Sequence, residues 1–147
     1  MRVSDVESGT SAPLGASVLP GGVNFSVFSP RAALVELLLF DDANAKAPSK
    51  ILPLHPGEHR TYHYWHVFVP GLQRGQVYAY RAHGPFEPDR GYRFDGEKVL
   101  LDPYGIAVAV PAVYDRRAAE KPGDNAPTAM KSVVADPGRY QIGRAHV

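Results

Sequence analysis

The 147-residue chain contains no cysteine, so disulfide bonds and thiolate-bound metal sites are excluded. It has no apolar run long enough to cross a membrane, and residues 1–10 lack the apolar stretch of a signal peptide. An excess of one charge is also lacking, because the net charge is +1 and the Lys and Arg residues are scattered. These absences argue against nucleic-acid and membrane partners and favour a cytoplasmic protein.

Glycine and proline are plentiful, with 14 of each, and they favour many turns and strands over helices. The hydrophobic content of 44% and the charged content of 21% are ordinary for a soluble globular protein. The length suits one domain with a substantial core but is short for a barrel enzyme.

Hydrophobic alternation predicts a series of short strands. Val23, Phe25 and Val27 share one face of a half-buried strand over 23–28. The nearly continuous apolar run 34–40 predicts a central strand, and Asp41-Asp42 ends it as turn residues. Pro53 predicts that a weaker strand over 50–54 lies at an edge.

Two aromatic strands are expected over 63–69 and 76–83, with 70–75 as their Pro- and Gly-containing connection. Further candidates are a short helix or strand over 97–101, an apolar run over 106–110 and a last strand over 131–135. One face of the first aromatic strand holds Tyr64, His66 and Phe68. The other face holds Trp65, Val67 and Val69. In the second aromatic strand, Tyr78 and Tyr80 share a face. This spacing of strands predicts an all-β fold, an antiparallel β-sandwich with long loops.

The chain divides into four predicted parts. Residues 1–12 are polar and unpatterned and predict a loose, disordered leader, and 13–110 form the sandwich. Residues 111–140 are expected to be an extended linker. The segment 141–147 ends in Ile142-Gly-Arg-Ala-His-Val147, which a common sequencing adapter encodes in one frame, so we expect the native sequence to end near Tyr140.

Several separated motifs occur in an order that resembles the N-terminal domain of bacterial glycogen debranching enzymes and isoamylases. They are Pro13-Leu14-Gly15-Ala16, Gly22-Val-Asn-Phe-Ser-Val-Phe-Ser29, Val35-Glu-Leu-Leu-Leu-Phe-Asp41, Trp65-His-Val-Phe-Val-Pro-Gly-Leu72, Gly75-Gln-Val-Tyr-Ala-Tyr-Arg81, His83-Gly-Pro85, Arg93-Phe94, Lys98-Val-Leu-Leu-Asp-Pro-Tyr104, Asp124-Asn125 and Lys131-Ser-Val-Val134. The resemblance covers almost all of residues 12–137.

The resemblance implies an immunoglobulin-like sandwich of the family-48 carbohydrate-binding type, fused to an α-amylase-type barrel that hydrolyses α-1,6-glucosidic branch points. The catalytic Asp, Glu and Asp of that barrel lie in downstream motifs that do not occur here. The resemblance therefore implies a non-catalytic piece of a glycoside hydrolase, truncated before the barrel, with no cofactor. Related branching and trehalose-releasing enzymes carry similar modules, so the reaction of the parent enzyme stays open.

Local catalysis and metal binding are the less favoured interpretations of the polar residues. A retaining glycosidase needs two carboxyl groups about 5–5.5 Å apart, but the acidic residues here resemble turn and cap residues. The candidates for such a catalytic pair of carboxyl groups are Asp41, Asp42, Asp89, Asp95, Glu97 and Asp102. His55, His59, His63 and His66 mimic metal-ligand spacing, yet Pro53 and Pro56 argue against the helix that would bring them together.

Aromatic residues offer either a core or a platform for sugar rings, and alternation favours the core for most of them. The long loop over 83–96 is expected to contact the barrel or the rim of the substrate, since long loops in compact domains are often functional. The candidate contacts for carbohydrate or for domain docking are Tyr62, Trp65, Phe86, Arg90, Tyr92, Arg93 and Phe94. The chain has one Trp, whereas glycogen-sensing members of the superfamily use an exposed pair, which disfavours strong autonomous glucan binding.

Three functions follow from these observations. The first is an accessory domain of a glycogen debranching enzyme that docks on its own downstream barrel and contacts an α-glucan such as glycogen or a maltooligosaccharide. The second is a free-standing glucan-binding module. The third is an immunoglobulin-like interaction domain without sugar binding.

Overall fold

The computed structural model describes residues 6–84, 86–87, 92–93, 98–112, 125–127 and 129–135. Within these ranges all regular structure is β, and every paired strand is antiparallel. The strands are β1 (Gly15–Leu19), β2 (Gly22–Phe28), β3 (Leu34–Phe40), β4 (Lys50–Leu54), β5 (Arg60–Thr61), β6 (Tyr64–Pro70), β7 (Val77–His83), β8 (Phe86–Glu87), β9 (Tyr92–Arg93), β10 (Val108–Ala109) and β11 (Lys131–Val133). The predicted all-β class is therefore confirmed.

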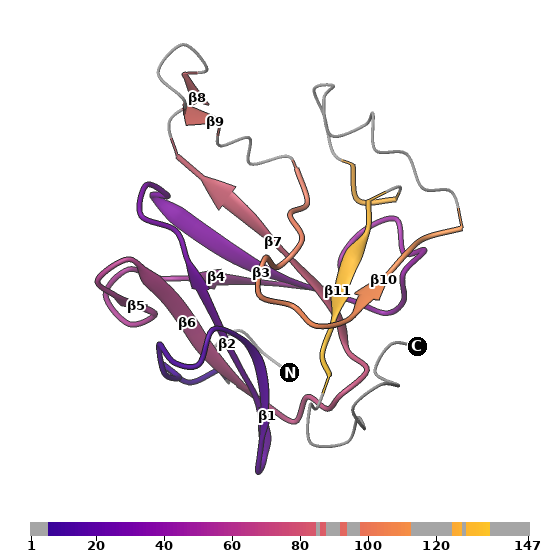
Figure 1. The fold of residues 1–147 in the computed structure, drawn as a ribbon, viewed down its shortest axis with the longest axis horizontal. Helices are drawn as coiled ribbons and strands as arrows, with labels where there is room; N and C mark the ends of the chain where they lie inside the picture. Colours follow the sequence, from indigo (N-terminus) through magenta and orange to yellow (C-terminus); the bar gives the residue numbers. More distant parts are fainter. Residues whose placement is uncertain are drawn as a thin grey trace.

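Two sheets face each other and form the sandwich (Figure 1). The four-stranded sheet has the order β1-β2-β6-β5, and the five-stranded sheet has the order β10-β11-β7-β3-β4. The short β8–β9 ladder lies beyond the end of β7. The two aromatic strands β6 and β7 thus belong to different sheets, and their connection crosses from one layer to the other. β4 is an edge strand, as Pro53 predicted.

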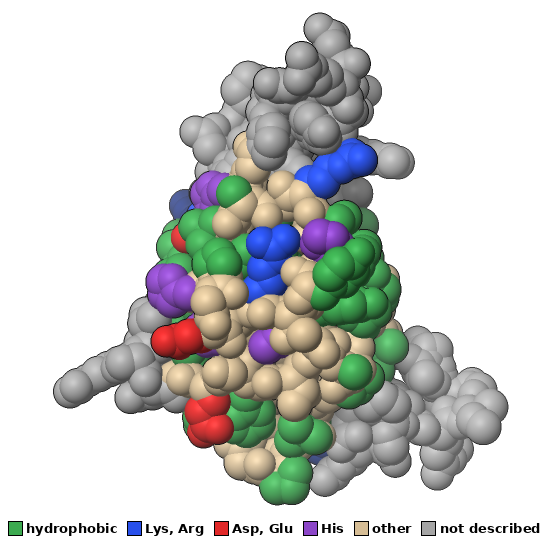
Figure 2. Space-filling view, turned by 90° about the vertical axis from the view of Figure 1, so that its left-hand side faces the viewer, with side chains coloured by type: hydrophobic (Ala, Val, Ile, Leu, Met, Phe, Trp, Pro, Cys, Tyr) green, Lys and Arg blue, Asp and Glu red, His purple; other side chains and the backbone are tan. Residues whose placement is uncertain are grey.

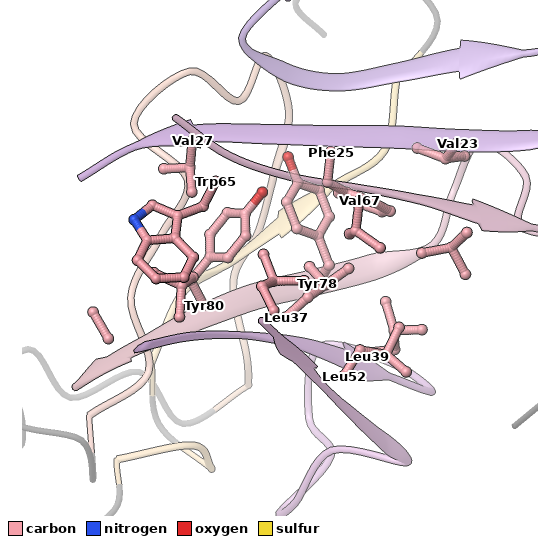
Figure 3. Close-up of a cluster of buried hydrophobic side chains, with 14 of the residues drawn as sticks. Val23, Phe25, Val27, Leu37, Leu39, Leu52, Trp65, Val67, Tyr78 and Tyr80 are labelled. Atoms are coloured by element: carbon pink, nitrogen blue, oxygen red, sulfur yellow. The ribbon is translucent and has the colours of Figure 1, made fainter. Parts of the chain in front are cut away.

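The core lies between the sheets and contains the side chains that the alternation assigned to it (Figure 3). β2 contributes Val23, Phe25 and Val27, and β6 contributes the Trp65 face. The rings of Phe25 and Tyr78 meet edge to face, with their centroids 4.9 Å apart, across the two layers. Such aromatic pairs add to the stabilisation that burial of their surface provides.

β3 is apolar on both faces because both of its faces are covered. Leu37 and Leu39 point into the main core, whereas Leu38 and Phe40 belong to a second cluster on the outer face. Segments 98–100 and 125–127 and residue 129 cover that outer face, and Val99 and Ala126 contact it. A strand that is buried on both sides has a continuous rather than alternating apolar pattern, as predicted.

The outer face of the four-stranded sheet is polar but also covered. Asn24, Ser26 and His66 are at most 5% exposed, and they bond to the N-terminal segment 7–12. Glu7 pairs with Phe68 through two backbone hydrogen bonds. Residues 6–12 are therefore attached to the sheet, which corrects the expectation of a loose leader over this range, because buried polar side chains on β2 and β6 need partners.

The C-terminal boundary of the sandwich also differs from the prediction. β11 was identified as a candidate strand but lies within the expected linker 111–140, and it pairs with both β7 and β10. The described part of the sandwich thus reaches residue 135, with Val134 in the main core. Segments 113–124 and 136–140 of the expected linker lie outside the described residues, as does the segment 141–147.

Residues 98–101 contain one isolated β-bridge instead of the short helix or strand expected over 97–101, of which residue 97 lies outside the described residues. Leu100 exchanges two backbone hydrogen bonds with Tyr80 at the outer edge of β7. The described residues include no helix long and apolar enough to span a membrane.

Candidate functional site

The predicted contact residues fall in three different environments. Tyr62 is 74% exposed, whereas Trp65 is fully buried. Phe86 pairs with Arg93 in the β8–β9 ladder, and Tyr92 belongs to the same ladder. Arg90 and Phe94 lie outside the described residues, so the role predicted for that loop stays a prediction.

Trp65 belongs to the core rather than to a ligand-facing surface. Its indole Nε1 donates a hydrogen bond to the carbonyl oxygen of Ser29 at 3.1 Å, which satisfies its one polar atom inside the sandwich. The guanidinium of Arg60 lies 5.0 Å from the centre of its ring, on the side toward β5. With no exposed face, the ring cannot stack on a sugar in this structure, which corrects its place among the contact candidates.

Tyr62 lies at the tip of the two-residue turn that joins β5 to β6. Its φ of 58° is the only positive φ of a non-glycine residue in the described ranges. Turns of this length need a positive φ at the first central position, where Gly, Asn and Asp are favoured. Tyr62 therefore occupies a strained backbone position and projects its ring into solvent.

Four rings form a continuous row beside this turn. The rings of Tyr62 and His63 are 3.9 Å apart between centroids, and His63 lies 6.1 Å from Phe28. Phe28, at the end of β2, lies 5.1 Å from Tyr64, its partner in the β2–β6 register. We call Tyr62, His63, Phe28 and Tyr64 the turn row. Figure 2 views the side of the molecule on which β5 lies, where hydrophobic and His side chains surround basic ones.

Arg60 is fixed beside the turn row. Its Nε donates to the carbonyl oxygen of Tyr62 at 2.8 Å, and its Nη2 lies 3.4 Å from Nδ1 of His63. Because a guanidinium has five N–H donors, a side chain held in this way keeps donors for a further ligand. Phe28, His63 and Arg60 were not among the predicted contacts. The two-residue spacing between the ends of β5 and β6 is the signal that would have placed Arg60 and His63 beside Tyr62.

Of the acidic candidates, Asp42 lies in a turn and Asp102 lies in the interior of the sandwich. Oδ1 of Asp42 accepts a hydrogen bond from the backbone N–H of Asn44 at 2.8 Å, which confirms the turn predicted there. Asp102 is 3% exposed and bonds to Tyr78. Three of the acidic candidates, Asp89, Asp95 and Glu97, lie outside the described residues.

The histidines do not converge on one point within the described ranges, where no group of three or more His, Cys, Asp or Glu residues could hold a metal ion. Nδ1 of His59 accepts the backbone N–H of His55 at 3.1 Å. Burial lowers the pKa of His59, an effect that Glu58 opposes and His55 reinforces. His66 bonds to the carbonyl oxygen of Ser8 and to the hydroxyl of Thr61.

A second exposed apolar feature follows the edge of the five-stranded sheet. Alternate side chains along 104–110 point to solvent, with exposed fractions of 40 to 60%; they are Tyr104, Ile106, Val108 and Val110. We call these four residues the edge row, because β10 is the outermost strand of its sheet. The sequence indicated this apolar run but not its exposure, because alternation does not reveal which face of a strand is covered.

A hollow lies elsewhere, at the end of the sandwich where β6 passes to β7. It has a volume of about 510 Å³ and is bordered by the connection 71–77 and the facing ends of β3 and β4. A neighbouring hollow of about 380 Å³ lies on the other side of the same connection. Both are open and shallow, and neither contains any of the predicted contact residues.

The two antiparallel sheets define an immunoglobulin-like β-sandwich. Residues 13–105 match the family model of carbohydrate-binding module 48 (isoamylase N-terminal domain), and the chain belongs to this family. It is 46% identical over 98 residues to the glycogen debranching enzyme of Erwinia tasmaniensis, with 67% of this chain and 14% of the relative covered. It is 45% identical over 106 residues to the chloroplastic isoamylase SU1 of Zea mays, with 70% and 13% covered.

Among solved structures, a product complex of the multi-modular glycogen-degrading pneumococcal virulence factor SpuA has a TM-score of 0.61. It is 19% identical and covers 90% of this chain and 13% of that one. At this level of identity the likeness shows the fold. The chain spans about one seventh of the length of the relatives described above.

Proposed function

We propose that this chain is the non-catalytic N-terminal module of a glycogen debranching enzyme, and that it docks on the catalytic part and contributes glucan contacts. The observation that supports this most is the family match over 13–105, with relatives that are debranching enzymes and isoamylases many times longer than this chain. The parent enzyme would hydrolyse α-1,6 branch points with residues that lie downstream of this module.

The edge row supplies a docking surface for that downstream part. Exposed apolar side chains on an edge strand, next to unpaired backbone groups, form a surface that proteins normally cover. β11, the last described strand, pairs with β10, so the chain runs beside the edge row just before the described residues end. A downstream domain would therefore begin close to this surface.

A chimeric enzyme tests the docking. Residues 1–140 replace the corresponding module of the Erwinia tasmaniensis relative, and thermal unfolding and glycogen debranching are measured. We expect Ile106→Asp to lower the melting temperature of the chimera, because an apolar side chain buried at the interface contributes about 1.5–3 kcal/mol. Ile51→Asp is the matched control, since Ile51 is 41% exposed on β4, the opposite edge of the same sheet. Equal effects of the two variants would contradict docking through the edge row.

Glucan contact is tested on the 147-residue chain itself. Its electrophoretic mobility in gels that contain glycogen, and its NMR spectrum during titration with maltoheptaose, report binding directly. Retardation by glycogen supports the proposal. No retardation and no shifts at millimolar maltoheptaose would leave docking as the only role and would contradict sugar contact by this chain.

A further inference from the structure

We propose that the β5–β6 turn is the glucan-binding site of this module, in which the turn row stacks on glucosyl rings and Arg60 bonds to their hydroxyl groups. This inference rests on the proposed glucan contact and names its location and its residues.

Tyr62 has a strained backbone conformation although its side chain is exposed. A non-glycine residue in a sparsely populated backbone region costs about 1–3 kcal/mol, and such residues gather at ligand-binding sites. Burial does not offset this cost, since Tyr62 is 74% exposed and is the most exposed of the large apolar side chains in the described ranges. A glycine would make the same turn without strain, so the ring itself is the feature that the position provides.

The ring arrangement matches the chemistry of a pyranose. One face of a glucosyl unit carries C–H groups and packs on an aromatic ring, while its rim carries hydroxyl groups that need hydrogen-bond partners. The row from Tyr62 through His63 to Phe28 offers adjacent rings. Several adjacent rings suit successive units of a glucan chain better than a single small molecule.

Arg60 supplies the polar partner at the edge of the rings. Its guanidinium is held by the carbonyl oxygen of Tyr62, by the imidazole of His63 and by stacking on Trp65. A preorganised side chain loses less conformational entropy when it binds a ligand. The buried Trp65 thus supports the site from below without touching the glucan.

Much of the outer face of each sheet is covered by the chain itself. Segments 98–100 and 125–127 and residue 129 cover the outer face of β3 and β7, and residues 7–12 cover that of β2 and β6. The edge row is apolar and exposed, but only one of its four members, Tyr104, is aromatic. Among the residues whose side chains the structure describes, the turn row is therefore the aromatic surface that is open to a sugar.

The experiment compares Tyr62→Gly and Tyr62→Phe in the 147-residue chain, with Tyr104→Ala as a control for loss of an exposed ring elsewhere. Maltoheptaose is titrated and followed by NMR, and the melting temperature of each variant is measured. We expect Tyr62→Gly to weaken binding at least about threefold, the size expected for loss of one aromatic contact. Its melting temperature should be unchanged or higher, because glycine accepts the positive φ. Tyr62→Phe, which keeps the ring, should bind more tightly than Tyr62→Gly, and Tyr104→Ala should bind like the unmodified chain.

The outcomes separate this inference from the proposed function. If the unmodified chain binds maltoheptaose and Tyr62→Gly binds equally well, the turn is not the site, while glucan contact by the module stands. If the unmodified chain shows no binding at millimolar maltoheptaose, the glucan contact and the turn site are both overturned. Weaker binding by Tyr62→Gly with intact folding, and not by Tyr104→Ala, supports the turn row.

Discussion

The phenolic hydroxyl of Tyr78 donates a 2.6 Å hydrogen bond to Oδ2 of Asp102 inside the sandwich. The other carboxyl oxygen accepts the backbone N–H of Tyr104 at 2.9 Å, and the backbone N–H of Asp102 donates to the hydroxyl of Ser132. Asp102 therefore attaches the turn before the edge row to β7 and β11. Burial raises the pKa of Asp102, and the hydrogen bonds from Tyr78 and Tyr104 partly oppose that shift.

The raised pKa of Asp102 predicts how stability changes with pH. Its folded pKa lies above the ordinary value of 3.8, so the native state holds the proton more firmly than the unfolded state. This contribution to stability is present below pH 3.8 and is lost as the pH rises through the folded pKa. We expect the stability of Asp102→Asn, relative to the unmodified chain, to increase between pH 4 and pH 7. Urea unfolding at several pH values measures this difference, and a constant difference would contradict it.

Tyr78 and Tyr80 form a matched pair for testing buried hydroxyl groups. The hydroxyl of Tyr78 has Asp102 as its partner, whereas that of Tyr80 has no hydrogen-bond partner among the described residues. Tyr78→Phe should lower the free energy of unfolding by about 1–3 kcal/mol, because it leaves a buried carboxyl oxygen without its donor. Tyr80→Phe should leave stability unchanged or raise it. Equal losses in the two variants would show that the hydrogen bond from Tyr78 to Asp102 contributes no stability of its own.

Replacement of Lys131 should have a large effect on stability, because its buried Nζ group has several hydrogen-bond partners. Its Nζ donates to the carbonyl oxygens of Ala43, Ala126 and Ala129, and it lies 5.0 Å from the centre of the Phe40 ring. The residue has no exposed surface. Lys131→Met should lower the free energy of unfolding by about 3 kcal/mol or more, since three carbonyl groups lose their donor.

The control for this substitution is Lys46→Met, because Lys46 is exposed in the loop after β3. A surface substitution of this kind should change the free energy of unfolding by no more than about 0.5 kcal/mol. Chemical unfolding of both variants is the measurement. Similar values for the two would mean that the carbonyl cage around Lys131 contributes no net stability.

Removal of the attached N-terminal segment should have a local effect on hydrogen exchange in β6. The amide N–H of Phe68 donates to the carbonyl oxygen of Glu7, and the amide of Glu7 donates back. Deletion of residues 1–11 should therefore speed hydrogen exchange at Phe68, while the amide of Tyr80, which bonds to Leu100, stays protected. Unchanged exchange at Phe68 would indicate that the segment is not attached in solution.

Sequence patterns predicted the sandwich and its inward faces because alternation reports directly on burial. Val23, Phe25 and Val27 on β2 follow the period of two, and the continuous run in β3 indicated burial on both sides. Hydrophobic patterns could not predict the covering of the outer polar face. In the sequence, Asn24 and Ser26 resemble solvent-facing strand residues. In the structure they are buried, because residues 10 and 11 lie over them and form hydrogen bonds with their side chains.

The candidate site was predicted only in part for a similar reason. The aromatic content of 62–65 marked the region, and Tyr62 proved to be exposed. The assignment of Trp65 to a contact surface was wrong, because strand alternation places it opposite Tyr64 and inside the core. Phe28 reaches the turn row through the β2–β6 register, a pairing between distant residues that sequence periodicity does not determine.

Trp65 and Tyr62 should respond in opposite ways to substitution, because one ring is in the core and the other is in solvent. Trp65→Phe should lower the free energy of unfolding by about 1–3 kcal/mol, since it removes buried volume and the bond to Ser29, and it should leave maltoheptaose affinity unchanged. In the unmodified chain, Trp65 fluorescence should be blue-shifted and poorly quenched by iodide, because the indole has no exposed surface. Strong iodide quenching would instead show that the indole is accessible and would return Trp65 to the contact candidates. Weaker sugar binding by a stably folded Trp65→Phe variant would show that the glucan site depends on Trp65, either directly or through Arg60.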